Sequence, residues 1–277
     1  MRCCFTIILN GLHHLAANGQ AEFIANNFDR WYIAEGASFS QGSTKWCKPM
    51  LDKYHNCGRS IDGTWLYLKQ LTDRYPNIIL VNNILVCQKE YMDKGFWKSK
   101  DAQVNACITS LKLQKVQECY LWQIDVDEQW SLENIEKSEK ELYQNDCKVG
   151  LFKCNYWVGP GLVAKGTWGE GDNENAYKRL WKWEGEWFKS HEPPILGDGD
   201  LTEITLPYRF NHYAYYYDQD VKFKDDWYGG HEGIYYRWKW LQREAKDKKV
   251  GHMWPISVLL DPNTYWGRTD TIITKVG

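Results

Sequence analysis

The sequence predicts an α/β protein with a mostly parallel central sheet flanked by helices. Strand-like and helix-like segments alternate through the first 130 residues, a pattern typical of βαβ units. Hydrophobic residues make up 43% of the chain and charged residues 25%, which argues against extensive disorder. No run of about 18 apolar residues occurs, so we expect no transmembrane helix.

The first half supplies the strands of the predicted sheet. Short apolar, β-branched runs predict strands over 5–9, 31–34, 78–81 and 120–124. Apolar residues at helical spacing between them predict helices over 14–26, 62–75 and 100–115, the first with Gly19 as a weak point. In such sheets a ligand binds at the carboxyl ends of the parallel strands.

The second half is richer in aromatic residues and loops. We predict a helix over 133–145 with Ser131 as its N-cap, strands over 149–158 and 206–211, and an aromatic helix over 235–246. No low-complexity linker or repeat divides the 277 residues. We therefore expect one domain over 1–277, with a parallel-sheet half that grades into an aromatic half.

Charge and cysteine usage exclude several classes of protein. The chain has 34 Lys and Arg against 36 Asp and Glu, a net charge of −2, so it has no field that would hold nucleic acid. Its nine cysteines are scattered without a C-x-x-C pair, which favours reduced thiols in a cytoplasmic, reducing compartment. Residues 1–12 are interpreted as a buried strand and not a signal peptide, and peripheral membrane contact stays open.

The most informative stretch joins an apolar run to acidic residues. The strand predicted over 120–124 leads directly into Asp125 and Asp127, and Glu128 follows. Alternate residues of an extended chain lie on one side, so the two aspartates would face the same way. Carboxylates that close repel each other unless a cation lies beside them, and Mg²⁺ or Mn²⁺ prefers such oxygen ligands. The alternative is a polar turn after a strand, because a lone D-x-D triplet is common.

Other segments surround this triplet in a recognisable order. The helix starting at Lys100-Asp101-Ala102 precedes the strand that ends in the aspartates, while the first two strands end at Asn10-Gly11 and at Glu35-Gly36. Over about residues 5–130, and most specifically over 100–128, this order resembles the nucleotide-sugar half of glycosyltransferases of the GT-A fold. The stretches 177–181, 191–194 and 211–224 resemble segments of family-2-like bacterial and viral sugar transferases.

The resemblance implies a metal-dependent glycosyltransferase that moves a sugar from a nucleoside-diphosphate sugar to a glycan or other hydroxyl acceptor. Residues 1–130 would then bind the donor, and residues 131–277 the acceptor. Asp127 would bind Mn²⁺ or Mg²⁺, and Asp125 would reach the metal or the ribose of the donor. Glu35, Asn10 and Asp101 would face the nucleoside; the alternative for each is a helix cap or loop hydrogen bond, which is at least as well supported for Asp101.

The resemblance also implies a histidine metal ligand from the C-terminal half. Among His212, His231 and His252 we favour His212, because it follows the strand predicted over 206–211. A lone histidine beside aromatic residues is otherwise a hydrogen-bonded core residue.

An inverting transfer needs a base for the acceptor hydroxyl, and a retaining transfer does not. Glu192 is the first candidate, because two prolines follow it and restrict its loop, and Glu232 is the second. Arg179 would hold a phosphate oxygen through its planar fork, or it pairs with a surface carboxylate.

Sixteen tryptophans and 18 tyrosines allow a different function. The alternative to the transferase is a non-enzymatic carbohydrate-binding protein that stacks sugars on the aromatic half; a glycoside hydrolase gains little support, because acids two residues apart lie too close together. Candidate acceptor-stacking residues, some of which must be core, are Trp157, Trp168, Trp181, Trp183 and Trp187.

Overall fold

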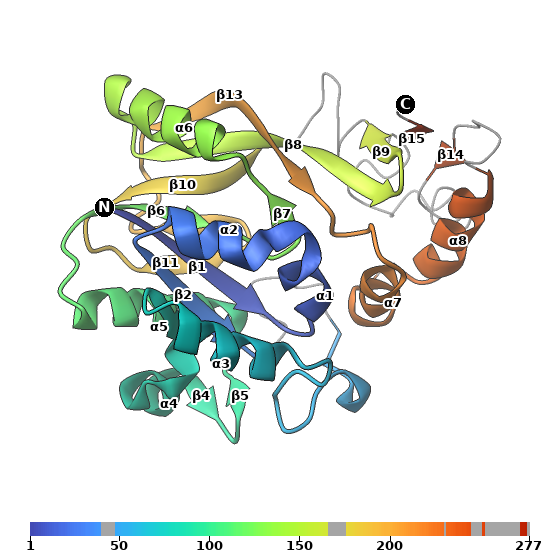
Figure 1. The fold of residues 1–277 in the computed structure, drawn as a ribbon, viewed down its shortest axis with the longest axis horizontal. Coiled ribbons are helices and arrows are strands. Elements are labelled where there is room, and N and C mark those ends of the chain that lie inside the picture. The colour runs from blue at the N-terminus through green and yellow to red at the C-terminus, as the bar shows by residue number, and fades with distance from the viewer. Residues whose placement is uncertain (40–47, 166–175, 230, 245–250, 253–271, 276–277) are drawn as a thin grey trace.

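The computed structural model describes residues 1–39, 48–165, 176–229, 231–244, 251–252 and 272–275 (Figure 1). Within these ranges, one large sheet has the order β14-β15-β9-β8-β10-β6-β1-β2-β3, and β13 pairs with both β8 and β7. Its strands are β1 (Arg2–Ile8), β2 (Arg30–Glu35), β3 (Ile78–Leu80), β6 (Cys119–Gln123), β7 (Glu128–Gln129), β8 (Val149–Gly159), β9 (Leu162–Lys165), β10 (Tyr177–Trp183), β13 (Glu203–His212), β14 (Gly251–His252) and β15 (Ile272–Lys275).

Helices and two small hairpins surround this sheet. The hairpins pair β4 (Met92–Asp93) with β5 (Phe96–Trp97) and β11 (Phe188–His191) with β12 (Pro194–Leu196). The helices are α1 (Leu12–Leu15), α2 (Gln20–Asn27), α3 (Thr64–Arg74), α4 (Leu85–Tyr91), α5 (Lys100–Leu113), α6 (Leu132–Gln144), α7 (Asp218–Trp227) and α8 (Ile234–Glu244), with 3-10 turns η1 (Ala17–Gly19), η2 (Asp52–Tyr54) and η3 (Val81–Asn83).

The central strands are parallel, as the alternation of segments predicts. β6, β1, β2 and β3 run parallel side by side, and β10 then joins β6 in the antiparallel sense. The α/β class with a sheet between helices is confirmed and is consistent with a GT-A-like single domain. The C-terminal strands extend the same sheet, so both halves of the chain share it.

Successive side chains of the parallel strands point to opposite faces of the sheet, and both faces are apolar. On one face Cys4 lies between Trp31 and Trp122 in register, and α2, α3 and α6 pack over this row. On the other face Phe5 and Tyr32 pack against α5. Helices on both faces explain why these strands read as nearly continuous hydrophobic runs.

Two expectations about local structure have clear outcomes. The helix predicted over 14–26 is broken into α1 and α2, because Asn18 and Gly19 adopt left-handed φ values of 51° and 69°. The cap prediction is confirmed, since the Asn134 amide donates to Ser131 Oγ at 3.2 Å. Helix α7 was not predicted, and it supplies part of the candidate site.

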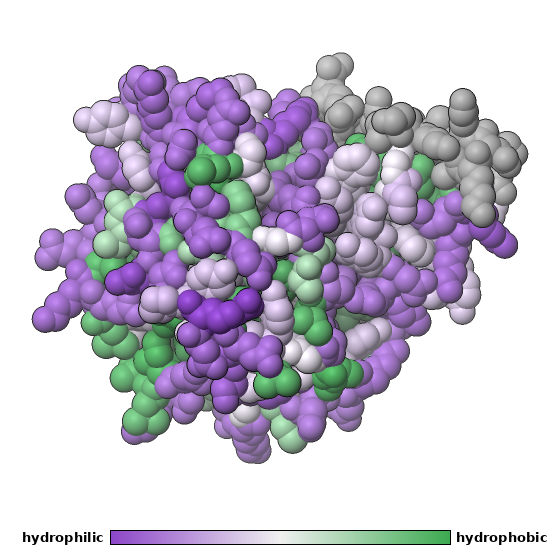
Figure 2. Space-filling model, in the orientation of Figure 1, coloured by the Kyte–Doolittle hydropathy of each residue, from purple (hydrophilic) through white to green (hydrophobic). Residues whose placement is uncertain are grey.

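The view in Figure 2 shows a mainly hydrophilic surface with a green patch at its lower left, over the region of α4. Leu85 and Val86 of that helix are 61% and 47% exposed. Within the described ranges, every helix is too short or too polar to span a bilayer. The eight cysteines there are all unpaired.

Candidate functional site at the carboxyl ends of the parallel strands

A cleft of about 760 Å³ opens at the carboxyl ends of the central parallel strands. Its lining includes residues 7–11 at the end of β1, residues 36–38 after β2, and Gln123, Asp125, Val126 and Asp127 at the end of β6. Residues of β13 and α7 line it from the other side. A ligand site is expected here in a parallel α/β sheet, because the strand ends leave backbone and loop side chains exposed at one edge.

The acidic triplet forms a turn at the end of β6. The Glu128 amide donates to the Asp125 carbonyl at 3.0 Å, so this segment is not fully extended, and both Asp125 and Asp127 nevertheless line the cleft. The chain then pairs as β7 with β13, which sets His212 opposite Glu128. This pairing brings His212 Nε2 to 3.5 Å from Asp127 Oδ2.

Asp127 and His212 form a half-buried ion pair. Burial by itself would raise the pKa of Asp127, but the charge and hydrogen bond of His212 outweigh it and hold that pKa well below its usual range. Burial likewise lowers the pKa of His212, while Asp127 overcomes this effect and raises it to about 10. A carboxylate oxygen and an imidazole nitrogen 3.5 Å apart fit one divalent cation bound between them.

Arg179 lines the same cleft and is bonded to two carboxylates. Its Nε donates to Glu128 Oε1 at 2.8 Å, and its Nη2 donates to Asp125 Oδ2 at 3.2 Å. Glu128 is fully buried, and burial raises its pKa to about 7 against the opposing effect of Arg179. Arg179 therefore pairs with the buried Glu128 and the half-buried Asp125, and these carboxylates already occupy its Nε and Nη2.

Asn10 and Glu35 hold a loop beside the cleft. Glu35 is fully buried, accepts from the Ser60 amide at 2.8 Å and pairs with Arg59 at 3.1 Å. Asn10 lines the cleft, and its Oδ1 accepts from the Ile61 amide at 2.9 Å. Both residues fix the segment 54–61, and Glu35 is not among the described residues that line the cleft.

Three other candidates from the sequence separate in space. Asp101 accepts a hydrogen bond from the His191 amide at 2.7 Å. This is the loop hydrogen bond that the sequence offered as the alternative to a nucleoside contact. Glu192 lines the cleft, where its carboxylate lies 3.4 Å from Lys100 Nζ. Glu232 lies elsewhere, with 60% of its side chain exposed and an ion pair to Lys48 at 2.6 Å.

The remaining histidines and the tryptophans are also placed. His231 lines the cleft and bonds Tyr215 Oη at 2.9 Å, whereas the side chain of His252 lies outside the described part. Trp181 and Trp183 are core residues, Trp187 is 41% exposed, and Trp168 is outside the described residues. Trp157 donates to Asn211 Oδ1 at 3.0 Å, and neither Trp157 nor Trp187 lines the cleft. The aromatic lining of the cleft comes instead from Tyr156, Tyr177, Tyr215, Phe223, Trp227 and Tyr228.

A further group of polar residues was missed by the sequence prediction. His14, Asp220 and Lys224 line the cleft beside the aspartates, and His13 lies next to His14. The adjacent histidines after the first strand were the one available signal. Asp220 lies 206 residues further along the chain than His14, so no local pattern could link them.

No protein-family model and no curated protein matches the chain. Among solved structures, its fold is similar to that in the crystal structure of S. aureus TarS, with 10% sequence identity and a TM-score of 0.40. The match covers 88% of this chain and 43% of the TarS chain, so this chain spans less than half of that protein. A likeness at this level assigns no role to any side chain, so the function is argued from the cleft itself.

Proposed function

We propose that this protein is a metal-dependent glycosyltransferase that moves a sugar from a nucleoside-diphosphate sugar to a hydroxyl of a glycan or another acceptor. The observation that carries the proposal is the pairing of Asp127 with His212 at the carboxyl end of β6, in the cleft of about 760 Å³ that Asp125 also lines. A cation bound there would neutralise the negative charge of a diphosphate leaving group.

Asp127 and His212 are the proposed ligands of Mn²⁺ or Mg²⁺. The cation, when bound, supplies Lewis-acid stabilisation of the diphosphate leaving group. His212 must be neutral to act as a ligand, and Asp127 raises its pKa to about 10 in the free protein. Binding of the cation at neutral pH would therefore release a proton from His212.

Asp125 has a different proposed role, because its carboxylate is oriented toward Arg179. We assign it to the donor ribose or to the outer side of the cation, with Arg179 as its positioning residue. Lys224 and Lys100, which line the same cleft, supply positive charge for phosphate oxygens.

Glu192 is the proposed base for the acceptor hydroxyl if the transfer inverts configuration. It lines the cleft, and 43% of its side chain is exposed, so an acceptor can reach it. Glu232 was the second candidate for the base. It pairs with Lys48 and is not among the residues that line the cleft, so we favour Glu192. We propose that residues 1–130 bind the donor and residues 131–277 the acceptor, since both halves line the cleft.

The alternative function is carbohydrate binding without transfer. Aromatic side chains such as Tyr177 and Trp227 in the cleft support it, because aromatic faces stack on sugar rings. Such binding would not depend on a chelator or on Asp127. The unpaired thiols support placing either activity in a reducing compartment.

Calorimetric titration with a panel of nucleoside diphosphates, in Mn²⁺ and in EDTA, tests the transferase. We expect one nucleotide to bind only with the metal and Asp127→Asn to abolish that binding. The matched control is Asp198→Asn, which alters a 96% exposed carboxylate paired with Lys189. Nucleotide release from the corresponding nucleotide sugar then identifies the donor.

Two results would contradict the proposal. One is the absence of metal-dependent binding for every nucleoside diphosphate tested. The other is a glycan bound equally well in EDTA and by the Asp127→Asn variant, which would favour the carbohydrate-binding alternative.

A further inference from the structure

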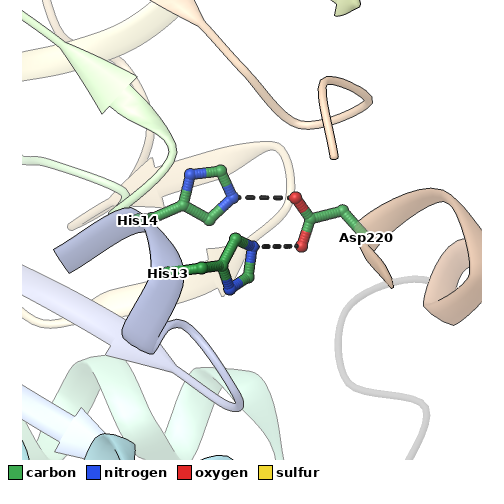
Figure 3. A group of neighbouring side chains, drawn as sticks. All are labelled: His13, His14 and Asp220. Atoms are coloured by element: carbon green, nitrogen blue, oxygen red, sulfur yellow. Dashed lines mark hydrogen bonds and ion pairs between the residues drawn. The ribbon is translucent and has the colours of Figure 1, made fainter. Parts of the chain in front are cut away.

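Two histidines and an aspartate converge at the edge of the cleft, apart from the Asp127–His212 pair. His13 and His14 lie on α1, directly after β1, and Asp220 lies in the first turn of α7 (Figure 3). His13 Nε2 is 2.9 Å from Asp220 Oδ1, and His14 Nε2 is 2.9 Å from Asp220 Oδ2. Both imidazoles therefore present the same ring nitrogen to one carboxylate.

The three side chains are sheltered and oriented. Their exposed fractions are 18% for His13, 7% for His14 and 15% for Asp220. Tyr217 packs edge-on against both imidazoles, at 5.1 Å and 5.2 Å between ring centroids, which restricts their rotation. One potential ligand atom from each of these three residues lies within 4.8 Å of the other two, which is close enough for all three to bind one metal ion.

We propose that His13, His14 and Asp220 bind a transition-metal ion of the zinc class, through ligands other than Asp127 and His212, at the edge of the same cleft. Two imidazole nitrogens and one carboxylate oxygen form a donor set that suits Zn²⁺, and Mg²⁺ prefers oxygen ligands alone. Ligands about 2.0–2.2 Å from one tetrahedral ion lie about 3.3–3.6 Å from each other. The two separations of 2.9 Å, each to a different oxygen of Asp220, are shorter than this, so the side chains would have to move apart by about 0.5 Å to admit the ion.

Three protein ligands leave one coordination position open. His14 and Asp220 line the cleft, so that position faces the space where we place the substrate. Water or an oxygen of a bound molecule can fill it.

The site would join parts of the chain that are distant in sequence. His13 and Asp220 are separated by 207 positions, and the ion would tie the end of β1 to α7. Phe223, Lys224 and Trp227 of α7 line the cleft, so an ion at this position would fix one of its walls. This inference does not depend on the proposed transferase activity.

The test uses the full chain after chelator treatment, titrated with Co²⁺ alone and followed by visible absorption. We expect one Co²⁺ per chain, displaced by Zn²⁺ and not by Mg²⁺. The spectrum should lack the intense sulfur-to-metal band of a cysteine site. Thermal unfolding in Zn²⁺ gives a second reading, because an ion that binds only the folded state raises the Tm.

Variants locate the ion. Asp220→Asn and His14→Asn should weaken Co²⁺ binding by more than about tenfold and abolish the Zn²⁺-dependent rise in Tm. The matched control is Asp218→Asn, on the same helix but 58% exposed, which should bind as the wild type does. Asp127→Asn should also keep the Co²⁺ site, which separates this inference from the nucleotide-dependent metal.

Three outcomes would overturn the proposal: no stoichiometric Co²⁺ binding by the wild type, unchanged binding by Asp220→Asn, or loss of binding in Asp127→Asn alone. The first would show that His13, His14 and Asp220 are a hydrogen-bonded cluster. The others would place the ion elsewhere in the cleft or on the surface.

Discussion

Arg179 offers the sharpest test of how the site is built. Its guanidinium is bonded to the fully buried Glu128 at 2.8 Å and to Asp125 at 3.2 Å. The structure thus predicts that Arg179 neutralises Glu128 and Asp125. An arginine that binds phosphate would instead need guanidinium N–H groups that are not already bonded to the protein. Replacement by methionine keeps much of the side-chain volume and removes the charge.

The expected cost follows from the burial of the pair. Removing one partner of a buried ion pair costs about 3–5 kcal/mol, because the other charge is left without compensation. We expect a loss of this size for Arg179→Met at pH 8. At pH 5 the loss should be smaller, since the pKa of Glu128 is already raised to about 7 and the unpaired carboxyl can protonate. Such a loss is a large fraction of an unfolding free energy of about 5–15 kcal/mol, so it is readily measured.

Urea unfolding followed by tryptophan fluorescence measures this loss. The double variant Glu128→Leu/Arg179→Met should recover much of it, because replacing both charges by apolar groups is often neutral. Arg74→Met is the surface control, with Arg74 54% exposed and 3.7 Å from Glu22, and should change stability by less than about 0.5 kcal/mol. If Arg179→Met is as stable as the wild type but no longer binds nucleotide, Arg179 is a phosphate ligand and the reasoning is refuted.

Other perturbations have equally direct outcomes. Glu192→Gln should lower the rate of an inverting transfer by about 10²-fold or more with little change in donor affinity, and Glu232→Gln should leave it unchanged; equal losses in a kinetic assay would contradict this. Because the pKa of His212 is raised to about 10, its charged form stabilises the metal-free protein below about pH 6.5, and this stability is lost as the pH rises toward 10. His212→Gln should lack that component of the Tm–pH profile, and identical profiles would exclude it. Gly58→Ala should destabilise far more than Gly19→Ala in urea unfolding: both glycines have positive φ, but a Cβ at position 58 would lie 2.3 Å from a backbone oxygen and one at position 19 meets nothing within 4 Å. Equal losses would mean that the loop carrying Gly58 adapts.

Local patterns were sufficient for much of the framework. The parallel strands were predictable because each is a short apolar run between helical segments, and the cap at Ser131 follows from one side chain and its neighbours. The break between α1 and α2 was indicated by Gly19 but not located, because helical spacing continues across it. Helix α7 was hidden by its tyrosine-rich flank and its many charges.

The acidic residues of the site could be found in the sequence because they follow a strand. Their partners in the structure could not be found in this way. The sequence favoured Glu35 and Asp101 as ligand-binding residues, since each lies at the beginning or end of an element at the edge of the sheet where a ligand is expected. In the structure their carboxylates accept backbone hydrogen bonds from Ser60 and His191. A buried carboxylate satisfied by the protein cannot be distinguished in sequence from one reserved for a ligand.

By itself, the sequence determined the α/β class, the parallel central strands and the position of the acidic triplet, because these depend on periodicity over a few residues. Only the tertiary structure decided which side chains the triplet meets. The pairing of β7 with β13 brings His212 to Asp127, and the packing of α7 against α1 brings Asp220 to His13 and His14. Strand register and helix packing set these contacts between segments far apart in the chain, and no local pattern of residues specifies them.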